Sequence, residues 1–358
     1  MTIPILADAS LPILTAAFPA PFQITTYDSP QQIPELLPGQ SILLCRSTLP
    51  INSGSFPKTE QLEIIATASS GIDHIDTHFL TNQQIRLFDA KGSNADAVAD
   101  YVMASLAYLR IHCAFEGKTA GIIGVGAVGS QVGQRLQKLG LRVIYYDPVR
   151  AISDTSFQSD SLEALQACDL ICIHANLHDT LPYPSRYLIS DEFLQQMVPK
   201  SVIINAARGN IVDERAIIEK LFSASSANAS TIKYCTDVYC NEPSINSKII
   251  QLSTLCTPHI AGHSIEAKLR AITMLSQKIH PYYRLQPPAL INQPVSNTSS
   301  TKINLSSSTP DWEQHILDFY NPLQETFILK QTLSDNISEV FLRLRRQHQF
   351  RHELTLVG

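Results

Sequence analysis

The chain has 358 residues, of which 44% are hydrophobic and 16% charged, and its formal net charge is −5. This length accommodates two or three domains, and the weak negative charge excludes a general attraction to nucleic acid or to an anionic membrane. Seven cysteines without a C-x-x-C pair or a zinc-ligand spacing indicate reduced thiols and no metal site. The chain has no basic signal-peptide start and no apolar run near the roughly eighteen residues of a membrane span, so we expect a cytoplasmic protein.

The first part of the chain predicts a small parallel α/β unit. Apolar runs typical of buried strands lie at residues 3–7, 41–45 and 63–68, and helix-length spacers separate them. Ligands in such sheets bind just beyond the carboxyl ends of the strands. Arg46, Ser47 and the turn at residues 69–71 are therefore candidates for substrate contact, although serine and glycine are also ordinary turn residues.

A helix is expected over residues 94–111. An apolar stripe at helical spacing is formed by Val98, Val102, Leu106 and Leu109. Because this helix leads directly into the glycine-rich segment that follows, we expect it to connect two domains.

Residues 119–148 contain a strand, a glycine turn, a helix, a second strand and an acid, in the order of a dinucleotide-binding unit. The first strand ends in a G-x-G-x-x-G turn made by Gly124, Gly126 and Gly129. The helix has Val128 near its start, and the second strand ends at Asp147.

The residue types of this segment fit the binding of a pyrophosphate. Gly124 permits the tight turn, Gly126 lets the backbone approach the ligand, and Gly129 lets the helix pack close to its strand. Unpaired N–H groups and the helix dipole then face the negative charge. Asp147 is placed to accept hydrogen bonds from the adenosine ribose and would repel a 2′-phosphate, which favours NAD over NADP. Single-nucleotide or flavin binding is the alternative.

The rest of the second half predicts a doubly wound sheet and a small tail. Continuous apolar strands are expected at residues 170–174, 202–207, 234–238 and 254–257, with a helix at 213–222 and a polar loop at 223–230. A linker is expected at 293–301, then a strand (302–306), three helices (310–320, 322–333, 335–348) and a last strand (353–357). This tail is small for a core of its own, so we expect it to pack on the rest of the chain or on a second copy.

Three polar residues follow strands of this second half, namely Arg208, Glu242 and His259. Oxidation of a 2-hydroxy acid needs a base for the hydroxyl proton, and histidine titrates near working pH. A carboxylate can fix the imidazole tautomer, and a guanidinium can hold the substrate carboxylate bidentately. Taken singly, each residue also has an ordinary explanation: a capping histidine, a solvated loop acid and a surface ion pair.

Four segments resemble the D-isomer-specific 2-hydroxyacid dehydrogenases, an NAD-dependent family with a split substrate-binding domain around a Rossmann-type domain. The segments are GIIGVGAVG…YYDP, INAARGNIVDERA, TDVYCNEP and TPHIAGHS, which lie in family order within residues 46–270. The resemblance implies that Arg208, Glu242 and His259 are the catalytic residues. The chain is most similar to members that carry an extra C-terminal dimerisation unit and oxidise a phosphorylated 2-hydroxy acid in vitamin B6 synthesis.

The same resemblance implies further contacts. Ser47, Ser69 and His263 fall on substrate contacts. Independently of the resemblance, Arg46 is a candidate for the phosphate because it lies beside Ser47. A second candidate is the arginine cluster of the tail, which could also be a solvated helix face or a dimer-surface ion-pair patch: Arg343, Arg345, Arg346 and Arg351. The implied cofactor contacts, besides the three glycines and Val128, are Asp147, Ala175, Ala206, Ala207, Asp237 and Gly262. Ser69 replaces a threonine, His263 replaces a tyrosine, and Ala175 offers the cofactor only its backbone.

We therefore expect an α/β fold of two doubly wound parallel-sheet domains, the first discontinuous, with a small α+β C-terminal dimerisation domain. The expected ranges are 1–92 with 259–288 for substrate binding, 93–258 for NAD binding and 289–358 for dimerisation. The expected activity is the NAD-dependent oxidation of a phosphorylated 2-hydroxy acid by a homodimer. The alternatives are a dehydrogenase of another D-2-hydroxy acid, such as 3-phosphoglycerate, or an NAD(H)-sensing binding protein like the family's transcriptional corepressors.

Overall fold

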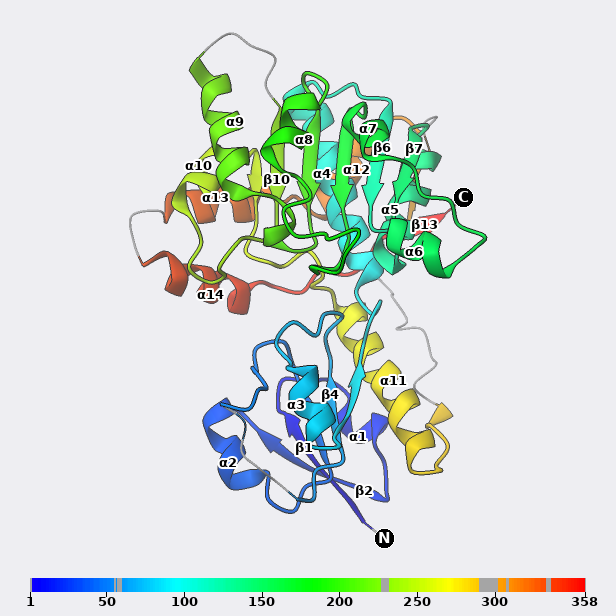
Figure 1. The fold of residues 1–358 in the computed structure, drawn as a ribbon. Coiled ribbons are helices and arrows are strands. Elements are labelled where there is room, and N and C mark those ends of the chain that lie inside the picture. Colours follow the sequence, from blue (N-terminus) through cyan, green and yellow to red (C-terminus); the bar gives the residue numbers. More distant parts are fainter. Residues whose placement is uncertain are drawn as a thin grey trace. The chain divides into compact units, whose positions relative to one another are not determined.

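The protein is described by a computed structural model (Figure 1), which covers residues 2–54, 56, 60–226, 232–289, 302–306, 309–332 and 336–357. The chain divides into two compact units. The first unit comprises Met1–Asn94 with Ser264–Ser299, and the second comprises Ala95–His263 with Ser300–Gly358. The first unit is thus discontinuous in sequence, as expected.

The first unit contains a parallel five-stranded sheet in the order β2-β1-β3-β4-β5. Its strands are β1 (Ile3–Asp8), β2 (Phe22–Tyr27), β3 (Ile42–Cys45), β4 (Ile64–Thr67) and β5 (Arg86–Asp89). Its helices are α1 (Leu14–Ala17), η1 (Pro30–Gln32), α2 (Ile33–Leu36), α3 (Thr77–Asn82) and α11 (Ile265–Tyr282).

Both faces of this sheet are buried, because the side chains of each strand alternate between two apolar clusters. On one face, Ile5 and Leu44 pack with Ile272, Leu275 and Ile279 of α11. On the other face, Leu6, Leu43 and Cys45 join side chains from α2 and α3. The alternation fixes the register of the strands.

The second unit contains a parallel six-stranded sheet in the order β11-β10-β9-β8-β6-β7. Its strands are β6 (Thr119–Ile123), β7 (Arg142–Tyr146), β8 (Leu170–Ile173), β9 (Val202–Asn205), β10 (Lys233–Thr236) and β11 (Leu255–Cys256). The helices of this sheet are α4 (Ala95–Cys113), α5 (Ala127–Lys138), α6 (Pro148–Ser153), α7 (Leu162–Gln166), α8 (Asp191–Gln196), η2 (Gly209–Ile211), α9 (Glu214–Ser226) and α10 (Ser247–Leu252). The chain order reverses between β6 and β8, which makes their carboxyl ends the topological switch point where such sheets bind ligands.

Two apolar clusters sandwich the six-stranded sheet. Ala120 and Ile122 face a cluster that includes α4 and α5. Ile123 and Ile171 face a cluster that includes α7, α8, α9 and α10. The buried guanidinium of Arg135 on α5 pairs with Asp100 of α4, which ties these two helices together.

The C-terminal segment packs on the second unit through both clusters. It contains β12 (Lys302–Asn304), α12 (Trp312–Phe319), α13 (Leu323–Gln331), α14 (Ile337–Gln347) and β13 (Thr355–Val357), and β12 pairs with β13 in parallel. Trp312 and Ile316 lie in the cluster that contains α4, whereas Leu329 and Phe341 lie in the cluster on the opposite face. The Cys256 N–H of β11 also donates to the Thr326 hydroxyl of α13 at 3.0 Å.

The predicted fold class is confirmed, because both parallel sheets and the small C-terminal helical region are present. The edge strands β2 and β5 and the long helix α11 are not among the elements predicted from the sequence. The polar loop expected at 223–230 is wrong in part, because α9 continues to Ser226. The expected linker at 293–301 lies outside the described residues. A separate dimerisation domain over 289–358 stays a prediction.

Two further findings bear on the composition. All seven cysteines are free thiols, and five of them are buried. None of the helices in the described ranges is long and apolar enough to cross a membrane.

Candidate active site

The glycine turn between β6 and α5 has the shape that its residue types require. Gly124 has a φ of +84°, and a Cβ there would overlap the backbone of Ala175. A Cβ on Gly129 would overlap the carbonyl oxygen of Gly124. A Cβ on Gly126, in contrast, would meet no atom within 4 Å. The turn is therefore closed by contacts at its first and third glycines and open at the second.

Asp147 joins this turn to the following helix. Its Oδ2 accepts a hydrogen bond from the Val125 N–H at 2.8 Å. Its Oδ1 caps α6 by accepting from the Arg150 N–H at 2.9 Å, and the Arg150 guanidinium donates to the Val125 carbonyl at 2.9 Å. Each carboxylate oxygen can accept a further bond, so the carboxylate retains acceptors for ribose hydroxyls. The ribose contact stays a prediction.

The residues of this edge fit a dinucleotide. The open side of Gly126 and the amides at the start of α5, where Val128 lies, suit a pyrophosphate. The other predicted cofactor residues follow the carboxyl ends of four strands, with Ala175 after β8, Ala206 and Ala207 after β9, Asp237 after β10 and Gly262 after β11. The sheet thus gathers them at one edge, and their cofactor contacts stay predictions.

Glu242 and His259 form a direct pair at that edge. The Nδ1 atom of His259 lies 2.7 Å from Oε2 of Glu242, and Glu242 Oε1 accepts the Tyr239 N–H at 2.9 Å. Burial acts to raise the pKa of Glu242, but the charge and hydrogen bond of His259 and the Tyr239 N–H outweigh it, so the pKa lies below its usual range. Glu242 is therefore a carboxylate at neutral pH.

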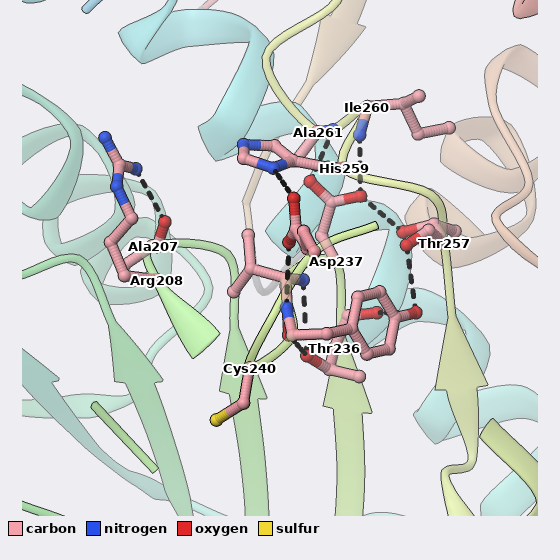
Figure 2. Close-up of polar contacts among 12 residues, drawn as sticks. Ala207, Arg208, Thr236, Asp237, Cys240, Thr257, His259, Ile260 and Ala261 are labelled. Carbon is pink, nitrogen blue, oxygen red and sulfur yellow. Dashed lines mark hydrogen bonds and ion pairs between the residues drawn. The ribbon is translucent and has the colours of Figure 1, made fainter. Parts of the chain in front are cut away.

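The loop that carries His259 is held by a buried acid (Figure 2). Asp237 is 1% exposed, and its carboxylate accepts hydrogen bonds from the Thr257 hydroxyl at 2.7 Å and from the Ile260 and Ala261 N–H groups at 2.8 Å each. His259 itself has a φ of +56°, in the left-handed region that is costly for a residue other than glycine. The bonds to Asp237 offset that strain and fix the direction of the imidazole.

Arg208 lies on the next strand connection, at the end of β9. Its Nη1 donates to the Ala207 carbonyl at 2.7 Å, and the Asn205 side-chain amide donates to the Arg208 carbonyl at 3.0 Å. A Cβ on Gly209 would overlap the Tyr239 backbone, so this connection packs closely on the one that carries Glu242. In Figure 2 the Arg208 side chain lies to the left of His259. The three predicted catalytic residues thus come from the neighbouring strands β9, β10 and β11.

The predicted substrate contacts of the first unit lie at the carboxyl ends of β3 and β4. Arg46 Nε donates to Asp8 Oδ2 at 2.9 Å, while Ser47 is exposed. The Ser69 hydroxyl lies 2.5 Å from the Thr67 hydroxyl. Asp8 is not among the predicted site residues, although it directly follows the first predicted strand, where ligands of such sheets bind.

His263 packs within the second unit against residues that follow α14. Its ring stacks on Phe350 with centroids 5.2 Å apart, and the His348 ring is 5.9 Å away. Burial, followed by the charges of Arg345 and His348, lowers the pKa of His263 well below its usual value, so the ring is neutral. These contacts with the C-terminal segment could not be predicted, because no local sequence pattern relates His263 to residues 348–350. The substrate contact of His263 stays a prediction.

Comparison with known proteins identifies the family to which the chain is similar. Residues 101–261 match the family described as D-isomer specific 2-hydroxyacid dehydrogenase, NAD binding domain. The chain is 49% identical to the erythronate-4-phosphate dehydrogenase of Legionella pneumophila, over 98% of this chain and 95% of the relative. It is 34% identical to the enzyme of that name from Coxiella burnetii, over 88% and 83% of the two chains.

Solved structures agree at the level of the fold. The 3-phosphoglycerate dehydrogenase of Entamoeba histolytica with bound NAD+ superposes with a TM-score of 0.64 at 21% identity, over 79% of this chain and 96% of that one. The NAD-dependent formate dehydrogenase of Staphylococcus aureus gives a TM-score of 0.61 at 21% identity, over the same shares of the two chains.

The doubly wound sheet, its glycine turn and the family match define the class of protein as an NAD-dependent dehydrogenase. Within that class, the chain belongs to the D-isomer-specific 2-hydroxyacid dehydrogenase family.

Proposed function

We propose that this protein oxidises 4-phospho-D-erythronate to (R)-3-hydroxy-2-oxo-4-phosphobutanoate with NAD, in the synthesis of pyridoxal 5′-phosphate. The observation that carries the chemistry is the 2.7 Å contact between His259 and Glu242. The substrate is proposed from the name of relatives that match almost the whole chain at up to 49% identity. NAD, when bound, accepts the hydride that leaves C2 of the substrate.

The state of His259 follows from its partner. A carboxylate can only accept hydrogen bonds, so Glu242 fixes the neutral imidazole as the tautomer that carries its proton on Nδ1. The Nε2 atom then has a free lone pair and takes the proton of the C2 hydroxyl as the hydride leaves. Glu242 stabilises the imidazolium that results, because opposite charges at this distance attract strongly in a partly buried site.

Arg208 holds the substrate carboxylate. Its guanidinium has five N–H donors, and the Ala207 carbonyl engages one of its nitrogens. The planar guanidinium group suits a bidentate contact with a carboxylate, and such a contact would also orient the C2 hydroxyl. Ser47, Ser69 and Arg46 of the first unit, together with His263, are proposed as further substrate contacts. Asp147 is proposed to select NAD by accepting from the ribose hydroxyls.

The substrate is tested by a panel of 2-hydroxy acids. Purified protein is incubated with NAD and, in turn, with 4-phosphoerythronate, 3-phosphoglycerate and unphosphorylated erythronate, and the reduced-nicotinamide absorbance is followed. We expect the highest kcat/KM with 4-phosphoerythronate. A higher kcat/KM with 3-phosphoglycerate would assign the other dehydrogenase activity. Tight NADH binding with no turnover of any acid would assign an NAD(H)-sensing protein.

We also propose that the protein is a cytoplasmic homodimer, with a substrate-binding domain at 1–92 and 259–288, an NAD-binding domain at 93–258 and a dimerisation domain at 289–358. Exposed apolar side chains on α13 and α14 support the dimer, because a second copy of the chain would cover them. These side chains are Leu323, Phe327, Ile328 and Leu342. Light scattering on the purified protein should give twice the mass of the 358-residue chain. Replacement of Phe327 by aspartate should then give a monomer, and a monomeric native protein would contradict the proposal.

A further inference from the structure

Arg46 belongs to a charged group at the carboxyl edge of the first unit's sheet. Its Nε donates to Asp8 at the end of the neighbouring strand β1, and its side chain remains 41% exposed. The same Asp8 carboxylate accepts from the Ser10 N–H at 2.9 Å and from the Ser10 hydroxyl at 2.6 Å. The Asp8 carboxylate therefore accepts hydrogen bonds both from the Arg46 guanidinium and from Ser10 in the turn after β1.

A second cation comes from α11. Lys268 precedes Ile272, Leu275 and Ile279 by four, seven and eleven residues, so it lies on the helix stripe that packs against the sheet. At the other end of α11, the Tyr283 hydroxyl donates to Glu63, the residue before β4. The helix therefore runs from the carboxyl edge of the sheet to its amino edge, and Lys268 lies in its first turns at the carboxyl edge.

The electrostatics agree with this placement. Burial lowers the pKa of Lys268, the positive charge of Arg46 lowers it further, and only Asp8 opposes these effects. The charged groups that act on Lys268 are thus a second cation, Arg46, and the carboxylate of Asp8. An anion that met both cations would remove their mutual repulsion.

We propose that Lys268 and Arg46 together bind the phosphate group of the substrate. The inference rests on the proposed function and deepens it, because it assigns the group that distinguishes a phosphorylated 2-hydroxy acid from an unphosphorylated one. A phosphate dianion matches two cations in charge, and lysine and arginine are both strong phosphate donors. Ser47 and Ser69, at the ends of the adjacent strands β3 and β4, are placed on the same edge.

The test compares Lys268→Ala with Arg284→Ala, a control in the same unit. Arg284 is exposed and lies just beyond the C-terminal end of α11, whereas Lys268 lies in the first turns of that helix. Lys268→Ala should raise KM for 4-phosphoerythronate about tenfold to a hundredfold, which is the range for losing a charge-assisted bond. It should leave kcat/KM for unphosphorylated erythronate and the Kd for NADH within about twofold of the parent. Lys268→Arg should restore most of the loss, because it restores the charge.

A second arm needs no turnover. Inorganic phosphate should raise the melting temperature of the wild-type protein and of Arg284→Ala, and should do so far less for Lys268→Ala. An equal phosphate response in Lys268→Ala and the control would overturn the proposal, as would an unchanged KM for the phosphorylated acid. If the wild-type protein oxidises no 2-hydroxy acid, the proposed function fails, and the phosphate response still decides whether Lys268 and Arg46 form an anion site.

Discussion

At the residue scale, the most informative group is Glu242, because it is the fixed partner of the proposed base. Replacing it with glutamine keeps an oxygen for the Tyr239 N–H but removes the negative charge beside His259. Because that charge stabilises the imidazolium formed during oxidation, Glu242→Gln should lower kcat about a hundredfold or more. The Kd for NADH, followed by fluorescence, should not change. An unchanged kcat would remove Glu242 from the mechanism.

The lowered pKa of Glu242 also predicts a pH dependence of stability. The folded state holds the proton more weakly than the unfolded state, so the stabilising contribution is present above the ordinary glutamate pKa and is lost as pH falls through the lowered value. The melting temperature of the wild-type protein should exceed that of Glu242→Gln at pH 7. The difference should shrink as the pH falls below about 4, near the ordinary glutamate pKa. A difference that grows on acidification would contradict the assigned direction.

At the scale of elements, substitutions in the glycine turn between β6 and α5 should affect stability and cofactor binding separately. Gly126 has a φ of −81° and open space at its Cβ position, so Gly126→Ala should fold with an unchanged melting temperature. The added methyl group would occupy the proposed pyrophosphate position and should raise the Kd for NADH at least about tenfold, or about 1.4 kcal/mol. Gly129→Ala serves as the contrast, because its Cβ would overlap the Gly124 carbonyl and should lower the melting temperature. Normal NADH affinity in Gly126→Ala would place the cofactor elsewhere.

The strands that could be predicted from the sequence differ physically from the strands that could not. The strands β6, β8 and β9 are buried on both faces, so they appear as continuous apolar runs. The missed strands β2 and β5 lie at the edges of their sheet and expose part of their side chains, as in Phe22–Tyr27. The contact between Glu242 and His259 could be inferred from strand ends and family likeness. The support from Asp237 and the cover of His263 by Phe350 depend on packing between distant segments, which no local pattern records.

At the scale of the whole molecule, the C-terminal segment is an integral part of the second unit. Trp312 is 3% exposed and lies in the cluster that covers one face of the six-stranded sheet. Trp312→Ala should therefore cost about 3–5 kcal/mol, the usual range for a buried large aromatic side chain, and lower the melting temperature. Phe222→Ala is the matched control, because Phe222 of α9 is 65% exposed and lies outside the C-terminal segment, so chain stability should stay nearly unchanged. Equal melting temperatures for the two variants would mean that the segment folds separately.

The same segment connects the fold to the site. Arg351 donates to the backbone carbonyls of Ala97 and Ala261, both at 2.7 Å, and to that of His263 at 3.2 Å. These bonds engage Arg351 with the loop that follows His259, so its main role in the structure is to hold that loop. Arg346, which is exposed, donates to the Leu342 carbonyl of its own helix. We therefore propose Arg46 and Lys268, rather than Arg346 or Arg351, as the cations that bind the substrate phosphate.

The central claim is that His259, oriented by Glu242, takes the hydroxyl proton during hydride transfer to NAD. The most direct test follows the absorbance of reduced nicotinamide when purified wild-type protein and His259→Gln are each given NAD and 4-phosphoerythronate. His315→Gln, which changes an exposed histidine of α12, is the control. The account predicts rapid reduction by the wild type and the control, and a loss of about a hundredfold to ten-thousandfold in kcat for His259→Gln with normal NADH binding. Reduction by His259→Gln at the wild-type rate would contradict it.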